Sequence, residues 1–131
     1  MNGLTSIRTM ADHFDLAIST LHYWERRGLV IPHRRAGQRF YDDAQVYRVA
    51  LIQLWRRTGL MSIDEIAALL SQSENWQEIV DARISDIDAQ MDRLAVAKRY
   101  LNHLKTCGHG PPLEECPEFR AGILTPEPRR P

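Results

Sequence analysis

The longest uninterrupted pattern in the chain runs from Trp76 to Lys105 and contains neither glycine nor proline. Its apolar residues recur mostly at alternating steps of four and three, which predicts one helix with a heptad seam along one face. Such a helix extends ~45 Å at ~1.5 Å per residue, too far to bury its seam against a small domain. The seam consists of Val80, Ile84, Ile87, Met91, Leu94 and Leu101.

The residues beside this seam are mostly charged, so the apolar stripe needs another helix as its partner. The chain contains one stretch of this kind. We therefore predict that two copies pair through the seam as a two-fold homodimer. The alternative is that the helix folds back onto its own globular part.

The beginning of the chain has the pattern of a small head. Residues 6–14 and 18–27 predict two short helices, the second ended by Gly28 in a left-handed conformation. Two helices joined by a tight turn outline a helix-turn-helix. Residues 33–41 then predict a hairpin with its tip near Gly37.

A longer helix is predicted after the hairpin. Asp42 or Asp43 can cap its beginning, and it ends near Thr58 because Gly59 follows. The Ser-x-x-Glu pattern that starts at Ser62 is a capping box for a further short helix. The expected core residues of the longer helix are Val46, Val49, Ala50, Ile52 and Leu54.

Charge is unevenly distributed along a chain that has 17 basic and 17 acidic residues. The first sixty residues hold nine arginines, no lysine and five acids, a net charge of +4. Three of these arginines, Arg34, Arg35 and Arg39, lie in the predicted hairpin. Arginine binds phosphates and enters narrow minor grooves, so the hairpin has the character of a DNA-binding wing.

The expected fold is therefore mostly α. It has a winged helix-turn-helix head, a long dimerisation helix, and a short C-terminal loop or helix. The predicted domains are residues 1–72 (DNA-binding head), 73–106 (dimerisation helix), 107–122 (effector loop and short helix) and 123–131 (mobile tail).

Composition argues against several other classes of protein. No apolar run approaches the ~18 residues of a membrane span, and the N-terminus lacks the apolar core of a signal peptide. We therefore expect a soluble, cytoplasmic protein without a membrane partner. The sequence has no Gly-rich phosphate loop, no HExxH motif and no nucleophile motif with an ordered base, so we do not expect an enzyme.

Three motifs resemble those of the MerR (mercury-resistance-type) family of bacterial transcriptional regulators. Residues 20–30, TLHYWERRGLV, are similar to that family's TLRYYExxGLL stretch, and residues 32–41, PHRRAGQRFY, look like its wing signature PxRxxxGYRxY. Residues 59–66, GLMSIDEI, resemble its GFSLxEI segment. The resemblance implies a homodimer joined by an antiparallel coiled coil. It also implies that the dimer binds and distorts double-stranded promoter DNA in response to an effector, together with RNA polymerase.

The resemblance also implies which residues contact DNA. His22 stands where the family has arginine, and a mostly uncharged imidazole makes a weaker phosphate contact. Trp24 stands at the family's second tyrosine, where we expect a core residue. Arg39 and Tyr41 could instead hold the wing against the third helix. The implied contacts are Ser19, Thr20, His22, Tyr23 and Arg26 in the second helix, and Arg34 or Arg35, Arg39 and Tyr41 in the wing.

Two cysteines lie in the segment after the long helix. Eight residues separate Cys107 from Cys116, and Pro117 follows, a spacing that resembles the loop of the family's mercury sensors. Thiolates prefer soft ions, and His109 could extend the pair toward a zinc site, so Cu⁺, Zn²⁺ and Hg²⁺ are the candidate ions. The segment 70–76 lacks the cysteine that mercury and zinc sensors of this family supply from the partner's helix.

Three interpretations of this segment stay open: a soft-metal sensor, a thiol redox sensor that forms a Cys107–Cys116 disulfide, and a loop that holds no metal and packs its cysteines as small apolar residues. Two other classes of function also stay open. One is a thiol or metal-transfer protein that uses Cys107, His109 and Cys116. The other is an architectural, excisionase-like DNA binder that needs no effector.

Overall fold

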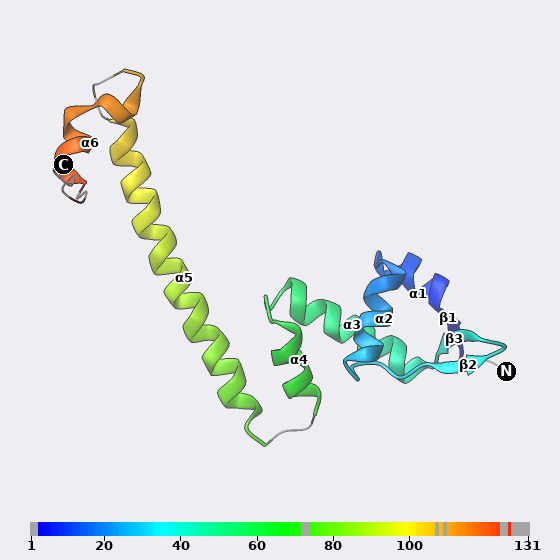
Figure 1. The fold of residues 1–131 in the computed structure, drawn as a ribbon. Coiled ribbons are helices and arrows are strands. Elements are labelled where there is room, and N and C mark those ends of the chain that lie inside the picture. The colour runs from blue at the N-terminus through cyan, green and yellow to red at the C-terminus, as the bar shows by residue number, and fades with distance from the viewer. Residues whose placement is uncertain (1–2, 72–73, 107, 109, 124–125, 127–131) are drawn as a thin grey trace. The chain divides into compact units, whose positions relative to one another are not determined.

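A computed structural model of the chain describes residues 3–71, 74–106, 108, 110–123 and 126. The chain divides into two compact units, Met1–Ile87 and Asp88–Pro131. The elements, drawn in Figure 1, are β1 (Thr5–Ser6), α1 (Ile7–Phe14), α2 (Ile18–Arg26), β2 (His33–Arg35), β3 (Gln38–Tyr41), α3 (Asp43–Arg57), α4 (Ile63–Leu70), α5 (Trp76–Lys105), the 3-10 helix η1 (Leu113–Glu115) and α6 (Pro117–Gly122).

Helices α1 and α2 form the predicted helix-turn-helix. The hydroxyl of Ser6 accepts a hydrogen bond from the Thr9 backbone N–H at 3.1 Å and so caps α1. Asp15 ends α1 in the left-handed region with φ 54°. Gly28 follows α2 at φ 72°, a conformation that a residue without a Cβ adopts readily.

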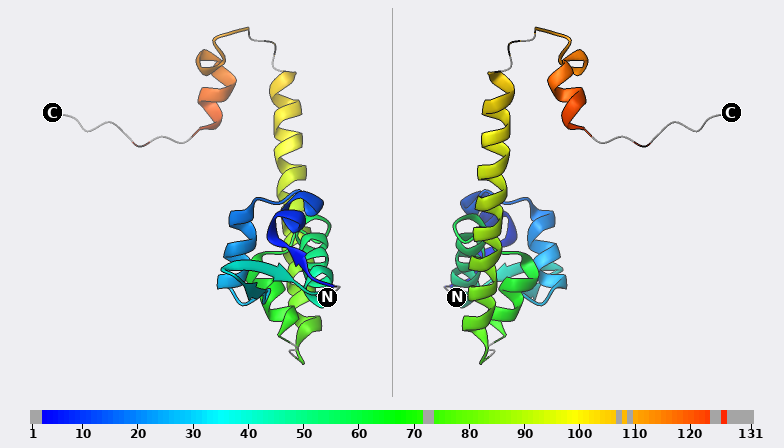
Figure 2. Two further views of the ribbon diagram at one scale, coloured as in Figure 1. Left: turned by 90° about the vertical axis from the view of Figure 1, so that its right-hand side faces the viewer. Right: turned by 90° about the vertical axis from the view of Figure 1, so that its left-hand side faces the viewer.

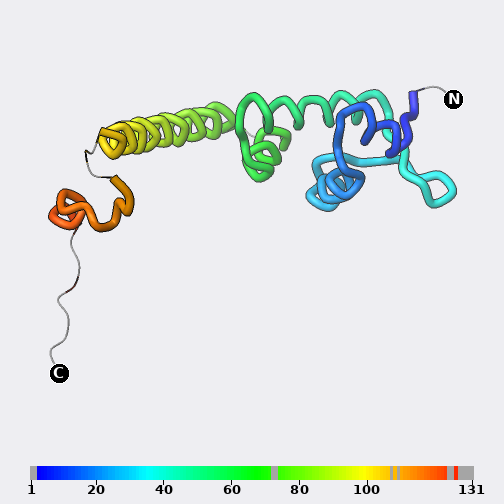
Figure 3. The backbone as a smooth tube through the Cα atoms, turned by 90° about the horizontal axis from the view of Figure 1, so that it is seen from above, coloured from blue at the N-terminus to red at the C-terminus, as the bar shows by residue number. Residues whose placement is uncertain are grey.

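Strands β2 and β3 form the predicted wing, an antiparallel hairpin in which Arg34 lies opposite Arg39. Ala36 and Gly37 make its tip with φ of 51° and 76°, the positive pair that a tight hairpin turn needs. Figure 3 shows the hairpin projecting from the helices beside it. Strand β1, which pairs with the other edge of β3, was not predicted, because a strand of two residues has no readable period.

The next two helices begin where their caps predict. Asp42 accepts a hydrogen bond from the Gln45 backbone N–H at 2.9 Å and caps α3. Both halves of the capping box between Ser62 and Glu65 are formed at the start of α4. Figure 1 shows α3 running from the sheet to α4.

The buried core of the first unit draws on α1, α2, α3, α4 and the sheet. One expectation was wrong: Leu54 is 53% exposed. Val49 and Ile52 are the buried residues of α3, and Leu54 lies about 200° around the helix from Ile52 at ~100° per residue. The buried apolar residues are Met10, Ala11, Leu21, Trp24, Leu29, Val30, Tyr41, Val49, Ile52 and Ile66.

Helix α5 covers the predicted range of 30 residues. None of its residues, all of which the structure describes, is buried. Val80 and Ile87 of the seam are half-buried, whereas Ile84, Met91, Leu94 and Leu101 are more than half exposed. The apolar seam is therefore uncovered in the single chain. No helix in the described ranges combines the length and apolar content needed to cross a bilayer.

Candidate nucleic-acid interface

Helix α2 has one buried side and one exposed side. Leu21 and Trp24 are buried, which confirms Trp24 as a core residue. The helical period of 3.6 residues then places Ser19, His22 and Arg26 on the opposite side. In both views of Figure 2, α2 lies at the outer edge of the first unit. The exposed side of α2 is therefore open to a large partner.

Three shallow hollows adjoin one another along this side of the unit. Ile18 lines both the hollow near the wing and the middle hollow, and Ser19 and Arg26 line both the middle hollow and the hollow toward α4. The three hollows therefore form one continuous surface. We call it the arginine surface. It is lined by Ser6, Ile7, Arg8, Ile18, Gly37, Gln38 and Arg39 near the wing, by Ile18, Ser19, His22 and Arg26 in the middle, and by Ser19, Thr20, Tyr23, Trp24, Arg26, Arg56 and Ile63 toward α4.

Four arginines line the arginine surface, and no acidic residue of the described ranges does. Sequence reasoning missed two of them, Arg8 and Arg56. Both counted toward the basic charge of the first sixty residues, but neither lies in the second helix or the wing. Only folding brings the end of α3, and with it Arg56, beside Thr20 and Tyr23.

Two wing arginines share one carboxylate on α2. Arg39 donates from Nε to Oε1 of Glu25 at 2.6 Å, and Arg34 donates from a terminal nitrogen to Oε2 at 3.0 Å. The Arg39 and Glu25 side chains are only 24% and 21% exposed, whereas Arg34 is 60% exposed. Arg35 is exposed and makes no ion pair within the described part of the chain.

Burial and these ion pairs act in opposite directions on the pKa of Glu25. Burial alone raises this pKa, because it disfavours the charged carboxylate. The hydrogen bonds from Arg39 and Arg34, together with their positive charges, outweigh burial and hold the pKa of Glu25 below its ordinary value. The carboxylate is therefore ionised and paired at neutral pH.

Tyr41, an implied wing contact, is fully buried in the core. Residues two apart in a strand share a face, so Tyr41 lies on the same side of β3 as Arg39, which faces Glu25 of α2. Its hydroxyl has no hydrogen-bond partner among the described residues. Burial, aided by the negative charge of Glu25, raises the pKa of Tyr41. The Tyr41 side chain is thus part of the core rather than of the arginine surface.

Tyr23 is held by Arg27, the residue that ends its own helix α2 and links it to α4. Arg27 donates to the Tyr23 hydroxyl at 3.0 Å and also pairs with Asp64 in the first turn of α4. Hydrogen bonds to Asp64 and Tyr23 raise the pKa of Arg27, which stays charged. Because the Tyr23 oxygen accepts from Arg27, its own hydrogen can still donate to a phosphate.

The second unit holds the predicted effector segment. Cys116 is 1% exposed and lies directly before α6, with Pro117 at the first helical position. Cys107 and His109 lie outside the described residues. Among the residues that are described, no group of three His, Cys, Asp or Glu side chains could hold a metal ion.

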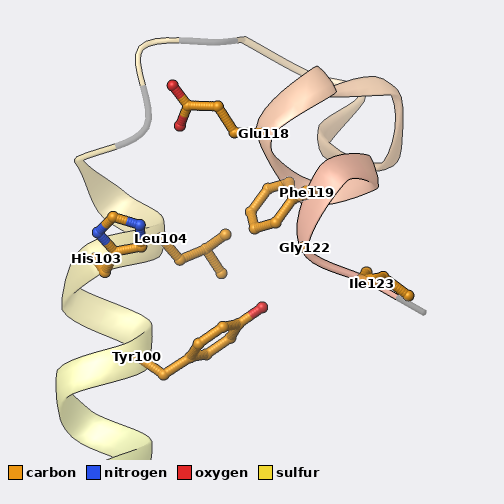
Figure 4. Close-up of a pocket in the computed structure, with 7 residues that line it drawn as sticks. All are labelled: Tyr100, His103, Leu104, Glu118, Phe119, Gly122 and Ile123. Atoms are coloured by element: carbon orange, nitrogen blue, oxygen red, sulfur yellow. The ribbon is translucent and has the colours of Figure 1, made fainter.

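A cavity of about 190 Å³ lies between the end of α5 and α6 in this unit. Figure 4 shows Phe119 of α6 and Leu104 of α5 directed toward one another, with Tyr100 and Glu118 on either side of them. The cavity is lined by Tyr100, His103, Leu104, Glu118, Phe119, Gly122 and Ile123.

The fold and the arginine surface define a winged helix-turn-helix protein. Residues 5–73 match the family model described as MerR HTH family regulatory protein, and residues 46–104 match the model described as MerR, DNA binding. The chain belongs to the MerR family of helix-turn-helix regulatory proteins, as its motifs indicated.

Individual relatives agree with this assignment. The transcriptional regulator HmrR of Rhizobium leguminosarum bv. viciae is 28% identical over 120 residues, which cover 86% of this chain and 92% of HmrR. A cryo-EM structure of the EcmrR–DNA complex in EcmrR-RPo is 31% identical with a TM-score of 0.63, over 79% of this chain and 40% of EcmrR.

The regulator PbrR691 of Ralstonia metallidurans, solved in complex with lead(II), has a TM-score of 0.69 and covers 88% of this chain and 96% of its own. At 24% identity this likeness shows the shared fold. The chain is thus a transcriptional regulator with a DNA-binding domain and is not an enzyme, since the relatives are transcriptional regulators.

The lowered pKa of Glu25 predicts how stability changes with pH. A carboxyl whose pKa is lower in the folded than in the unfolded chain (ordinarily ~4.3 for Glu) stabilises the fold above the unfolded value. That contribution is lost as the pH falls through the folded pKa. We expect the unfolding free energy of the unmodified protein to exceed that of Glu25→Gln at neutral pH, with the difference shrinking on acidification. Urea denaturation of both proteins across the acidic range measures this, and a difference that is constant with pH would contradict it.

Proposed function

We propose that the chain is a homodimeric regulator that binds and distorts double-stranded promoter DNA in the cytoplasm, in contact with RNA polymerase. The observation that carries this proposal is the arginine surface, on which Arg8, Arg26 and Arg56 make no ion pair within the described residues, while the fourth arginine, Arg39, is paired with Glu25. DNA presents a dense row of phosphates, and their neutralisation supplies most of the sequence-independent affinity. The EcmrR–DNA complex supports the proposal through a relative.

Helix α2 is the element that we expect in the major groove. A helix with its side chains is ~10–12 Å wide, and the groove is ~12 Å wide. With Leu21 and Trp24 committed to the core, Ser19, Thr20 and His22 are left to approach base edges or phosphates. The wing then reaches the adjacent minor groove, where a narrow groove attracts arginine.

Arg26 and Arg56 approach the same hollow from α2 and from the end of α3. Arg8 lines the hollow beside the wing, from the first turn of α1. We propose that these three arginines bind phosphates on either side of the groove that α2 enters. Contacts from three separate helices would fix the orientation of the head on the duplex.

Two heads bind together if α5 pairs with α5 of a second copy. The uncovered seam on α5 supports this, since so many exposed apolar residues on one helix need a cover. We accordingly assign residues 1–72 as the DNA-binding head, 73–106 as the dimerisation helix, 107–122 as the effector segment and 123–131 as a tail. A dimer would read two half-sites at a separation set by α5.

We propose that the effector acts on the second unit through Cys116 and Cys107. The donor set that fits is a thiol pair, which suits a soft ion such as Cu⁺ or Hg²⁺, with His109 as a further ligand for Zn²⁺. Alternatively, a peroxide would take two electrons and two protons from the two thiols and leave a disulfide. Either change would act directly at the start of α6, since Cys116 precedes this helix, and the cavity beside Phe119 offers space for α6 to shift against α5.

Replacing Arg56 tests the DNA-binding proposal. We expect Arg56→Ala to weaken binding and to lower the salt slope of affinity by about one for each head, hence by about two for a dimer. Fluorescence anisotropy over a salt series, with a duplex that the unmodified protein selects from a random pool, measures both. Arg57→Ala is the matched control, because the exposed Arg57 is adjacent in sequence and lies outside the arginine surface. Equal slopes for all three proteins would contradict the assignment of Arg56.

Replacing Ile87 tests the dimer. We expect Ile87→Asp to give monomers, because it places an unpaired charge in the apolar seam. Ser85→Asp, an exposed position outside the seam on the same helix, should leave the dimer intact. Light scattering coupled to size-exclusion chromatography reports the mass of each. A dimer that survives Ile87→Asp would rule out pairing through this seam.

Replacing Cys116 tests the effector proposal. Protein purified without reductant or chelator is divided for metal analysis and a free-thiol count, and its DNA bending is measured with Cu⁺, Zn²⁺, Hg²⁺ or hydrogen peroxide. We expect one of these treatments to change the bend angle in the unmodified protein and to have no effect on Cys116→Ser. If no treatment changes the bend, the cysteines do not sense these effectors, and the loop without metal and the architectural binder are the interpretations left. Metal release to an acceptor without DNA affinity would indicate the metal-transfer alternative.

A further inference from the structure

Glu25 stands between the two parts of the head that face DNA in the proposed function. Its oxygens take one arginine from each strand of the wing, Arg39 at 2.6 Å from β3 and Arg34 at 3.0 Å from β2. Arg34 and Arg39 are also direct cross-strand partners. One carboxylate on α2 therefore holds both strands of the hairpin at the same rung.

This contact matters because the wing has few other attachments to α2. All three residues of β2 are exposed, so β2 is not anchored by burial. The base of the hairpin is tied to α3 and its cap, through His33 to Asp42 at 3.1 Å and through the Ile31 backbone N–H to Gln45 at 2.8 Å. On its other side, β3 is held to the core by its pairing with β1 and by the buried Tyr41. The ion pairs with Glu25 are what fix the rung of Arg34 and Arg39 against α2.

The charges of the two wing arginines also indicate that Glu25 stabilises the position of the wing. Like charges directly opposite each other on paired strands destabilise the pair, and Arg34 and Arg39 are such a pair. The carboxylate of Glu25 lies between them and offsets their repulsion. The Glu25 carboxylate also accepts a hydrogen bond from the Nε of the half-buried Arg39. The exposed Arg35, at the end of β2, has no carboxylate partner in the described ranges.

We propose that Glu25 is a positioning residue of the DNA-binding head. It locks the wing to α2 so that both meet the duplex in one fixed geometry, and Arg35, rather than Arg39, is the phosphate ligand of the wing. This inference rests on the proposed function, in which α2 and the wing bind DNA.

The substitution Glu25→Gln separates this role from simple electrostatics. Removing an acid from a DNA-facing head would by itself strengthen binding to phosphates. If Glu25 positions the wing, Glu25→Gln instead lowers the preference for the selected duplex over a random one, by about tenfold. Glu25→Asp keeps the charge and should restore part of the preference. Asp12→Asn, which removes an exposed acid of the head that lies outside the arginine surface, is the matched control and should leave the preference unchanged.

A double-mutant cycle tests the partner of Glu25. We expect Arg39→Gln and Glu25→Gln to lower the preference by similar factors, and the double variant to be no worse than either, because they break the same lock. Arg39→Gln should keep the salt slope of the unmodified protein, whereas Arg35→Gln lowers it by about one for each head. Circular dichroism confirms that each variant is folded.

Different results of these experiments would contradict the role of Glu25 and the proposed DNA-binding function on which it rests. Preference that is unchanged or increased in Glu25→Gln, or additive losses in the double variant, would overturn the lock. A salt slope lowered by Arg39→Gln and unchanged by Arg35→Gln would overturn the assignment of the phosphate ligand. Failure of the unmodified protein to bind any duplex would instead overturn the proposed function.

Discussion

The burial of Leu21 and Trp24 on one side of α2 is the constraint on which the DNA-binding head depends. An indole and an isobutyl group removed from water stabilise the fold by about 1.5–3 kcal/mol or more each, enough to fix the rotation of α2 about its axis. That rotation decides which residues are left outside. Ser19, His22 and Arg26 are exposed or half-buried because their neighbours in the helical period are buried.

Electrostatics then divides the arginines of the head into two groups. Arg27, Arg34 and Arg39 are paired with carboxylates and connect elements of the fold to one another. Arg26 and Arg56, by contrast, line the arginine surface and make no ion pair within the described residues, so their side chains are available to an external anion. The same residue type therefore serves the fold in one place and the proposed ligand in another, and the nearest carboxylate decides which.

Helix α5 differs from the head in what stabilises its structure. The head buries ten residues in a core of its own, whereas α5 buries none within the single chain. Its helical conformation follows from a run without glycine or proline, and its apolar seam stays available for a second copy. In the second unit, α6 begins directly after the buried Cys116 and faces the end of α5 across a cavity.

The order of the helices as far as α5, the hairpin tip at Gly37, a cap for α3 at Asp42 or Asp43, the capping box that starts at Ser62 and the family resemblance could all be read from the amino-acid sequence. These features depend on neighbours in the chain, where capping, turn chemistry and periodicity act. The strand β1, the burial of Tyr41, the pairing of Glu25 with two wing arginines and the place of Arg56 beside α2 were decided by the tertiary structure alone. Each of them joins residues far apart in the chain or depends on which face of a strand turns inward, and short-range patterns in the sequence carry no record of such contacts.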